Sequence, residues 1–379
     1  MRRVASYLLA ALLLTAAYGA VAQTPDSAYL ARVQDSVDRY FRRHPGRRPV
    51  KKDSRFKTFP LYGIMYTQEA GLMAMGGFMG SYRTCTDSLV PMSSIGAVAM
   101  VSTNLSVASA VTGRAYFSDG RFMIGYLARY NYGRRYFWGL GFENGNDGSM
   151  RGSITSSRVR VRTDFLYRGQ RIVAGGFLGY DFYDAAGISG PPVITGNPSG
   201  TQYIMAGGRF DFDSRDDMAS PSRGLFLNVE PSAGISVSGS APFLRLEAVF
   251  DFFVPLWNGG VMAVDLYGNV SSASAPWTVW PEAGGDVRLR GYYQGRYRDR
   301  NLLSAQVELR QRIYRSHGVA VWGGAGNVFP SFSGIRIKNT LPTYGAGYRF
   351  TFLGMVLRLD AGFGLPGQWA LIAGVSHSF

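Results

Sequence analysis

Charged and less polar side chains alternate along several short segments of this chain. In segment 158–165, three arginines and an aspartate alternate with valines, a threonine and a phenylalanine. Because successive side chains of a β-strand point to opposite faces, all four charges fall on one face. The same alternation recurs in segments 209–213, 244–252, 307–313 and 357–361. One such strand fits a soluble β-sandwich, whereas five in one glycine- and aromatic-rich chain favour a transmembrane barrel with a polar interior.

Runs of this kind, separated by turn residues, predict sixteen antiparallel strands. Their ranges are 72–82, 94–101, 104–117, 120–131, 134–142, 156–168, 171–183, 201–213, 222–236, 242–254, 261–273, 301–314, 317–328, 342–352, 354–364 and 369–379. Long connections such as 83–93 and 274–300 alternate with short turns, as in outer-membrane barrels, and an even strand number returns both chain ends to the periplasm. We predict a sixteen-stranded antiparallel transmembrane β-barrel over residues 59–379, with segment 59–68 as an entry segment beneath it.

The first 58 residues follow other patterns. Residues 1–22 contain two arginines, an apolar run and a small-residue cleavage site, which predict a signal peptide. Residues 23–58 are predicted to be periplasmic, beginning with a short amphipathic helix whose apolar residues recur at three- and four-residue spacing. The basic segment 42–57 follows. This region either docks on phospholipid or an acidic partner, enters the barrel as a plug, or forms a solvated tether.

Composition agrees with an exported barrel. The 379 residues include 49 glycines, 24 phenylalanines and 23 tyrosines but only 17% charged residues, which suits close strand packing and aromatic girdles. No segment after the signal approaches the roughly 18 apolar residues of a membrane-spanning helix. The single cysteine, Cys85, cannot form an intramolecular disulfide. The net charge of +15 fits nucleic acid, anionic lipid or an acidic client. Since the chain is exported and has no nucleic-acid motif, we expect outer-membrane lipid and no nucleic acid as partners.

Catalytic and cofactor-binding motifs are missing from the sequence. The three histidines fall in the basic segment (His44), in a short predicted turn (His317) and on the lipid-facing side of the last strand (His377). None accompanies a convincing serine or aspartate constellation, so nucleophilic and acid–base catalysis have little to use. No metal-ligand spacing, phosphate-binding loop or cofactor fingerprint appears. We predict no enzymatic activity, no cofactor and no metal.

The connection 274–300 is the most informative segment, because a loop this long inside a compact fold is usually functional or disordered. Its five arginines, two aromatic pairs and paired glycines favour a folded loop. Arg290 is solvated if the loop stays outside the barrel. If the loop folds inward, the guanidinium requires acceptors, because an unpaired buried charge is costly. Glu308 and Asp360 are interior-facing carboxylates on later predicted strands.

Three segments together resemble the barrel of the BamA/TamA-type superfamily, also called the bacterial surface antigen family. Segment 212–227 is similar to the family's periplasmic turn, and the matching residues are Asp213, Arg215, Asp216, Pro221 and Gly224. Gly284-Gly285 followed by Arg290-Gly291-Tyr292 is similar to the family's inward-folded extracellular loop and its tip. Segment 344–364 is similar to the closing strands with an inward aspartate. The resemblance covers residues 200–379, with a looser fit from residue 72.

This resemblance implies an outer-membrane protein of a Gram-negative bacterium that assists insertion or translocation of other proteins. It implies that Glu308 and Asp360 receive Arg290, while Gly291 lets the backbone approach the wall and Tyr292 packs on it. The terminal Phe379, on the same face as Leu371, resembles the family's sorting signal. A lateral seam is expected between the first and last strands, and its candidate glycines are Gly76, Gly77 and Gly374.

Members of the family usually carry periplasmic repeat domains before the barrel, whereas residues 23–58 are too few for even one. We therefore expect a short member whose partners are outer-membrane lipid, client barrel or secreted proteins, and separate periplasmic accessory proteins. The alternative prediction is a passive or gated outer-membrane channel or receptor without assembly activity. It shares every barrel feature, and an arginine-rich interior would favour anions.

Overall fold

The computed structural model describes residues 56–379 except 68–69, 85–89, 118–119, 192–199, 219, 238, 240, 353–354 and 376. The predicted signal peptide, the amphipathic helix and nearly all of the basic segment lie outside the described residues. The first strand, β1, begins at Phe56, within the segment assigned to the linker. None of the described helices has the length and apolar character needed to cross a membrane.

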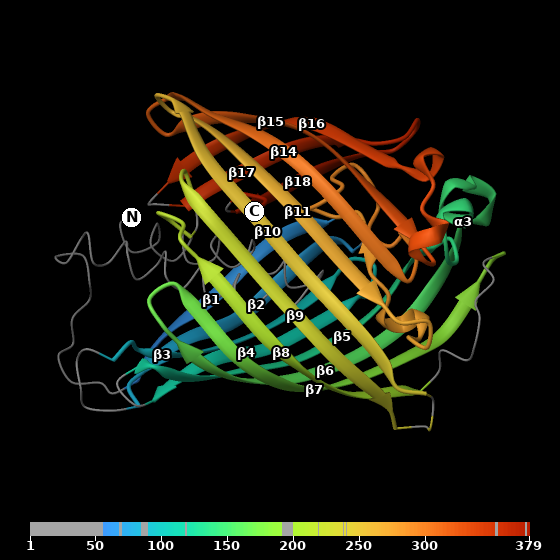
Figure 1. Cartoon of the computed structure of the whole chain (residues 1–379), viewed down its shortest axis with the longest axis horizontal. Coiled ribbons are helices and arrows are strands. Elements are labelled where there is room, and N and C mark those ends of the chain that lie inside the picture. The colour runs from blue at the N-terminus through green and yellow to red at the C-terminus, as the bar shows by residue number, and fades with distance from the viewer. Residues whose placement is uncertain are drawn as a thin grey trace.

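One antiparallel sheet of sixteen strands makes up most of the described chain, and its strands follow chain order (Figure 1). The strands are β1 (Phe56–Thr67), β2 (Gly71–Tyr82), β3 (Ser93–Ser102), β4 (Val107–Phe117), β5 (Phe122–Phe137), β6 (Gly152–Arg168), β7 (Ile172–Ser189), β8 (Thr201–Asp213), β9 (Gly224–Ser236), β10 (Phe243–Trp257), β11 (Gly260–Ser271), β14 (Asn301–Tyr314), β15 (His317–Phe329), β16 (Leu341–Phe352), β17 (Met355–Phe363) and β18 (Trp369–Val375). A separate ribbon pairs β12 (Glu282–Ala283) with β13 (Tyr297–Arg298) inside the connection from β11 to β14.

The strands tilt and curl round a common axis, so the sheet has an interior and an outer face (Figure 1). Interior charges are buried, as at Asp164, whereas its outward neighbour Phe165 is 57% exposed. The alternation of charged and apolar residues therefore corresponds to these two faces, and the all-β antiparallel class is confirmed. Within the described residues no ladder joins β1 to β18, so these strands are the two edges of the sheet.

The two ends of this curled sheet differ, because successive connections alternate between them. The end where β1 begins and β18 ends carries turns such as 258–259 and 315–316, and we call it the turn end. The opposite end, the loop end, carries connections 138–151 and 272–300. Its short helices are α3 (Phe142–Asn146), η3 (Gly148–Met150), η4 (Trp277–Val279), η5 (Phe332–Gly334) and η6 (Ile337–Asn339).

Two strand predictions are wrong, and their errors cancel in the count. The predicted entry segment 59–68 belongs to β1, which pairs with β2 along its whole length. Predicted strands 120–131 and 134–142 are mostly the single strand β5. Gly133 does not break it, because the chain continues to pair with β6 at this position. A Cβ there would collide with Ser106, which explains the glycine. Since β1 precedes β2, the long connection 83–92 lies at the turn end and not with the other long loops.

Candidate functional site: the inward-folded loop tip

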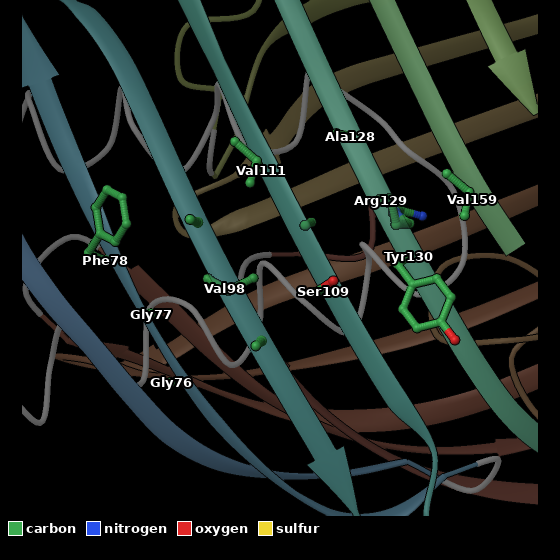
Figure 2. A pocket seen from close by; sticks show the side chains of 13 residues that line it. Gly76, Gly77, Phe78, Val98, Ser109, Val111, Ala128, Arg129, Tyr130 and Val159 are labelled. Atoms are coloured by element: carbon green, nitrogen blue, oxygen red, sulfur yellow. The ribbon is translucent and has the colours of Figure 1, made fainter. Parts of the chain in front are cut away.

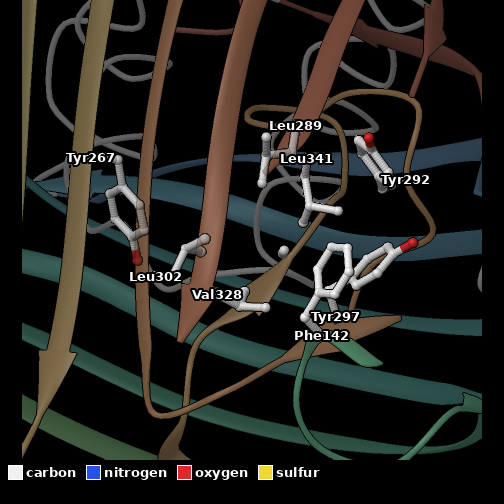
Figure 3. Packing of buried hydrophobic residues seen from close by; sticks show 9 residues of the cluster. Phe142, Tyr267, Leu289, Tyr292, Tyr297, Leu302, Val328 and Leu341 are labelled. Atoms are coloured by element: carbon white, nitrogen blue, oxygen red, sulfur yellow. The ribbon is translucent and has the colours of Figure 1, made fainter. Parts of the chain in front are cut away.

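The connection 272–300 folds into the interior of the curled sheet and forms a tight turn there. The N–H of Tyr292 donates to the Leu289 carbonyl at 3.2 Å, and the N–H of Gly285 donates to the Tyr292 carbonyl at 3.2 Å. Gly284 and Gly285 have φ angles of 99° and 113°, which L side chains rarely adopt, so this reversal needs glycine. Leu289 and Tyr292 pack in a buried cluster with Leu341 of β16 (Figure 3).

Arg290 occupies the centre of this tip and is completely buried. Its Nη2 lies 2.8 Å from Glu308 Oε2 of β14, and its Nη1 lies 2.9 Å from Asp360 Oδ2 of β17. The guanidinium also lies over the Trp322 ring of β15, 3.6 Å from the centroid. The two predicted ion pairs are therefore present. Two carboxylates and an aromatic face offset the desolvation of this arginine.

Three further arginines complete the charge cluster. Arg310 Nε donates to Glu308 at 2.8 Å, Arg349 bridges both carboxylates, and Arg358 donates to Asp360 at 3.3 Å. Arg358 also lies 3.1 Å from Asp286 of the loop. Four arginines thus surround three carboxylates, and the second layer of arginines went unidentified in the sequence. Strand alternation places such residues inside, but only the register between strands makes them neighbours.

The backbone of the tip touches the wall so closely that glycine is required on both sides. Gly291 has φ 117°, and a Cβ there would come within 2.7 Å of the Phe363 backbone. A Cβ on Gly362 would come within 2.8 Å of the Arg290 carbonyl group. Tyr292 Oη donates to the Pro342 carbonyl at 2.6 Å, as expected of a side chain packed on the wall.

A second arginine fixes the same loop to another strand. Arg288 donates from Nη2 to Asp265 Oδ2 of β11 at 2.6 Å and from Nε to Oδ1 at 2.9 Å. Gln306 of β14 donates to Asp265 and also to the Val287 carbonyl of the loop. Asp265 is completely buried, so its charge depends on these donors. This anchor was not predicted, although Arg288 is one of the five loop arginines.

The neighbouring connection 138–151 holds the loop from the loop end. Arg296 Nε donates to the Gly145 carbonyl at 2.8 Å, and the rings of Phe142 and Tyr297 lie 5.5 Å apart. Arg135 Nη2 of β5 lies 2.9 Å from Glu282 Oε1 of the ribbon. Contacts from β5, α3, β11, β14 and β17 therefore keep the loop inside.

The predicted turn motif forms the compact connection 214–223 at the turn end. Arg215 pairs with Asp213 at 2.6 Å, and Gly224 has φ 106°. Asp216 accepts hydrogen bonds from the Ser222 hydroxyl and from the N–H groups of Ser222, Arg223 and Asp217. Partial burial opposes ionisation of Asp216, but these hydrogen bonds outweigh it and lower the pKa of its carboxyl group.

Arg310 connects this turn to the charge cluster and to the C-terminus. Its Nη1 approaches the Pro221 carbonyl at 3.5 Å, and its Nη2 donates to the Phe379 carbonyl at 2.9 Å. The Phe379 ring packs against Phe253 with centroids 6.3 Å apart. Phe379 is only 4% exposed, so the prediction that it continues the outward face of β18 is wrong. The strand ends at Val375, and the last residues turn inward towards Arg310.

The predicted seam glycines do not lie together. Gly76 and Gly77 belong to β2, which is paired on both sides by β1 and β3, so they are not at an edge. Gly374 does lie in the edge strand β18, where a Cβ would meet the Arg358 guanidinium. Gly76 instead lines an apolar groove of about 450 Å³ that also touches Ser109 and Val111 (Figure 2). The seam prediction was misplaced because β1 was not identified as a strand.

The histidines form no catalytic arrangement in the described part of the chain. His317 is exposed and contacts Tyr348 and Phe350. His377 does not face outward as predicted, since its Nδ1 lies 3.9 Å from Glu308 Oε1 in the interior. His44 lies outside the described residues. Among those residues, no group of three or more histidine, cysteine, aspartate or glutamate side chains is arranged to hold a metal ion.

Known structures match this architecture, whereas no protein-family model and no curated protein sequence matches the chain. BamA from Haemophilus ducreyi lacking POTRA domains 1–3 superposes with a TM-score of 0.60 at 12% identity, covering 86% of this chain and 71% of that chain. This chain has the BamA/TamA-type barrel fold. CdiB from Acinetobacter baumannii superposes with a TM-score of 0.57 at 13% identity, and the match covers 85% of this BamA/TamA-type barrel chain and 60% of that chain. CdiB from Escherichia coli superposes with a TM-score of 0.57 at 12% identity, and the match covers 86% of this chain and 62% of that chain.

The predicted resemblance is therefore confirmed at the level of the fold. The BamA/TamA-type barrel described here spans about three fifths of the length of the two CdiB chains.

Proposed function

We propose that this chain is an outer-membrane barrel that assists the insertion or translocation of other proteins, with the connection 272–300 as a folded interior plug. The observation that carries the proposal is the complete burial of Arg290 between Glu308 and Asp360. Burying a loop arginine carries a desolvation penalty. A loop that only covers the surface could leave the arginine in water and avoid this penalty. The loop is thus held in one position by charge, which is what a conformational lock requires.

Placement in the outer membrane also assigns each end of the barrel to one side of the membrane. The loop end faces the cell exterior, and the turn end faces the periplasm, where both ends of the described chain lie. Exposed apolar side chains on the outer face, including Leu244, Ile313 and Leu371 at 64%, 64% and 65%, meet the hydrocarbon. Separate accessory proteins can then supply client-binding domains at the periplasmic turn end.

The edges β1 and β18 form the proposed lateral seam. Edge strands expose unpaired backbone groups that can template another strand by hydrogen bonding. No ladder between β1 and β18 appears among the described residues. A client strand would therefore add to the edge of β1 or β18, and not to β2 as the glycine pattern had indicated. The chain itself acts without enzymatic chemistry in this proposal.

Depletion of the protein from its host tests the function directly. If the chain assists assembly, other barrels decrease in the outer membrane while their precursors accumulate in the periplasm. Complementation with the wild-type chain should restore them, and the Arg290→Ala variant should restore them less. Unchanged barrel levels after depletion would contradict the proposal and favour a channel or receptor.

A further inference from the structure

Two arginines share one buried carboxylate on the interior wall formed by β6 and β7. Arg158 and Arg160 of β6 face the interior, and both donate to Asp181 of β7. The Nε and Nη2 groups of Arg158 donate to Asp181 at 2.8 and 2.6 Å, and the same two groups of Arg160 donate to Oδ2 at 3.0 and 2.8 Å. Asp181 is 3% exposed, so one buried carboxylate compensates two guanidinium groups only in part.

A second pair of arginines shares one carboxylate of the β12–β13 ribbon. Arg135 of β5 donates from Nη1 to Glu282 Oε2 at 3.0 Å, and its Nη2 lies 2.9 Å from Oε1. Arg298 is opposite Glu282 in the ribbon and forms an ion pair with the same Oε1. Arg298 is 2% exposed, and its Nε has no hydrogen-bond acceptor in the part of the chain that the structure describes. A donor of this buried guanidinium is therefore unused.

The two arginine pairs lie around one aromatic cluster. The rings of Tyr183 and Trp277 contact each other edge to face at 5.8 Å. Arg158 lies over the Tyr183 ring at 5.8 Å from its centroid, and Arg298 lies over the Trp277 ring at 5.3 Å. Arg135 and Arg158 are both close enough to Arg298 to repel its charge. Four arginines thus meet two carboxylates, which leaves an excess of two positive charges. We call Arg135, Arg158, Arg160 and Arg298 the interior arginine site.

The excess is local, and the site can be reached. The next group of interior charges towards the turn end has more carboxylates than arginines, because Arg162 and Arg209 contact Asp164, Asp211 and Glu230. The side chains of the two β6 arginines of the site are 25% and 23% exposed at positions that face the interior. Their Nη1 groups donate to no acceptor among the described residues. These donors are therefore available to a ligand in the interior.

We propose that the interior arginine site binds a phosphate group, carried either by inorganic phosphate or by a phosphomonoester. Guanidinium groups bind phosphate oxygens through paired N–H donors, which suits a site built from arginines alone. A phosphate group carries a charge of about −1.5 to −2 at neutral pH, which offsets the two excess positive charges. The bound group connects β6 with the ribbon and adds to the contacts that hold the loop inside. The inference goes beyond the proposed assembly function and does not depend on it.

Isothermal titration calorimetry on the detergent-solubilised full chain tests the site, with inorganic phosphate and glycerol 3-phosphate as the two probes. The wild-type chain should bind inorganic phosphate, glycerol 3-phosphate or both at a single site. Arg160→Gln should weaken this binding about tenfold or more, because it removes one guanidinium group from the ligand. Asp181 keeps Arg158 as its partner in this variant. The charge-matched control Arg336→Gln, at an exposed position of the loop end, should bind like the wild type.

A second variant predicts a change of the opposite sign. Glu282→Gln keeps the shape of the side chain but removes one negative charge from the site, so phosphate binding should become stronger. A merely structural role of these residues predicts weaker or unchanged binding. Heat-modifiable migration shows that each variant is folded. If Arg160→Gln does not fold, Arg160→Lys retains the charge without the planar fork and should still bind more weakly than the wild type.

The two probes and two competitors separate the outcomes. Binding of inorganic phosphate alone assigns the site to the free ion, whereas binding of glycerol 3-phosphate as well extends it to phosphomonoesters. Binding of neither probe overturns the proposal, and so does binding that Arg160→Gln leaves unchanged. Displacement by an equal concentration of chloride would show a nonspecific charge effect and also overturn it. An oligoglutamate peptide that binds where phosphate does not would assign the site to an acidic protein segment instead.

Discussion

Arg290 shows how one buried charge can order a whole loop. Its guanidinium touches groups from β14, which directly follows the loop, and from β15 and β17, which lie farther along the chain. Because both carboxylates are buried, removing Arg290 costs each of them one ion-pair partner, although Arg310, Arg349 and Arg358 remain beside them. The same logic holds for Arg288 and Asp265 on the other side of the tip.

At the residue scale we predict that Arg290→Ala destabilises the folded barrel by about 3 kcal/mol, because Glu308 and Asp360 each lose an ion-pair partner. The fraction of heat-modifiable barrel during urea titration measures the change. Arg290→Lys should be intermediate, since an ammonium group cannot reproduce the planar fork. A variant as stable as the wild type in both readouts would falsify the role of the pair.

A second prediction at the residue scale concerns Asp216. Its lowered pKa means that the folded turn favours the carboxylate. The stabilisation is present at pH values above the unfolded pKa and is lost as the pH falls through the folded pKa. We expect the turn 214–223 to become more accessible to hydrogen exchange on acidification below about pH 4. Asp216→Asn should show raised exchange at neutral pH and little further change with acid, and an acid response equal to wild type would contradict the assignment.

At the scale of elements, β18 is shorter than its sequence pattern indicates. The alternation predicts a strand that continues to Phe379, with His377 in place of an apolar residue, but the strand ends at Val375 and residues 377–379 turn inward. Arg310 holds the terminal carbonyl while Glu308 accepts a hydrogen bond from Ser378 Oγ at 3.2 Å. The charge cluster that binds the loop thus also binds the end of the seam strand.

Phe379→Ala should therefore loosen β18 selectively. The ring loses its packing against Phe253, and we expect about 3 kcal/mol of destabilisation for a fully buried phenylalanine. Hydrogen exchange should increase in β18 and β17 more than in β6 and β7, which serve as the internal control. Phe379→Leu should retain much of the protection. Equal effects on all four strands would show that the residue is not specific to this edge.

At the scale of the whole molecule, the inward loop determines how open the barrel is. Contacts from α3, β11 and the closing strands hold it inside, so wild-type protein in planar bilayers should show small or gated conductance. Arg288→Ala/Arg290→Ala removes both anchors and should give larger or more frequent openings. Arg336→Ala, at an exposed site of the loop end, is the matched control. Large steady steps in the wild-type chain would instead indicate a porin.

Local patterns predicted much of the fold, whereas the pairing of Arg290 with Glu308 and Asp360 was implied by the family resemblance. Period-two alternation assigned charges to the interior, and the inward carboxylates Glu308 and Asp360 followed from it. Strand β1 was missed because its short apolar run gives no information about its partner. Strand β5 was predicted as two strands because Gly133 was assigned to a turn. In the structure the strand continues through Gly133, where it pairs with β6.

The sequence by itself determined the two faces of the sheet, the glycine-dependent loop tip and the need for acceptors around Arg290, because these depend on neighbouring residues and elementary charge energetics. Only the tertiary structure decided which strand is the edge, which arginines surround the carboxylates and where the last residues turn. Those features depend on register between strands far apart in sequence. Arg310 illustrates the difference, since its contacts with Pro221, Glu308 and Phe379 exist only once β14 is in place.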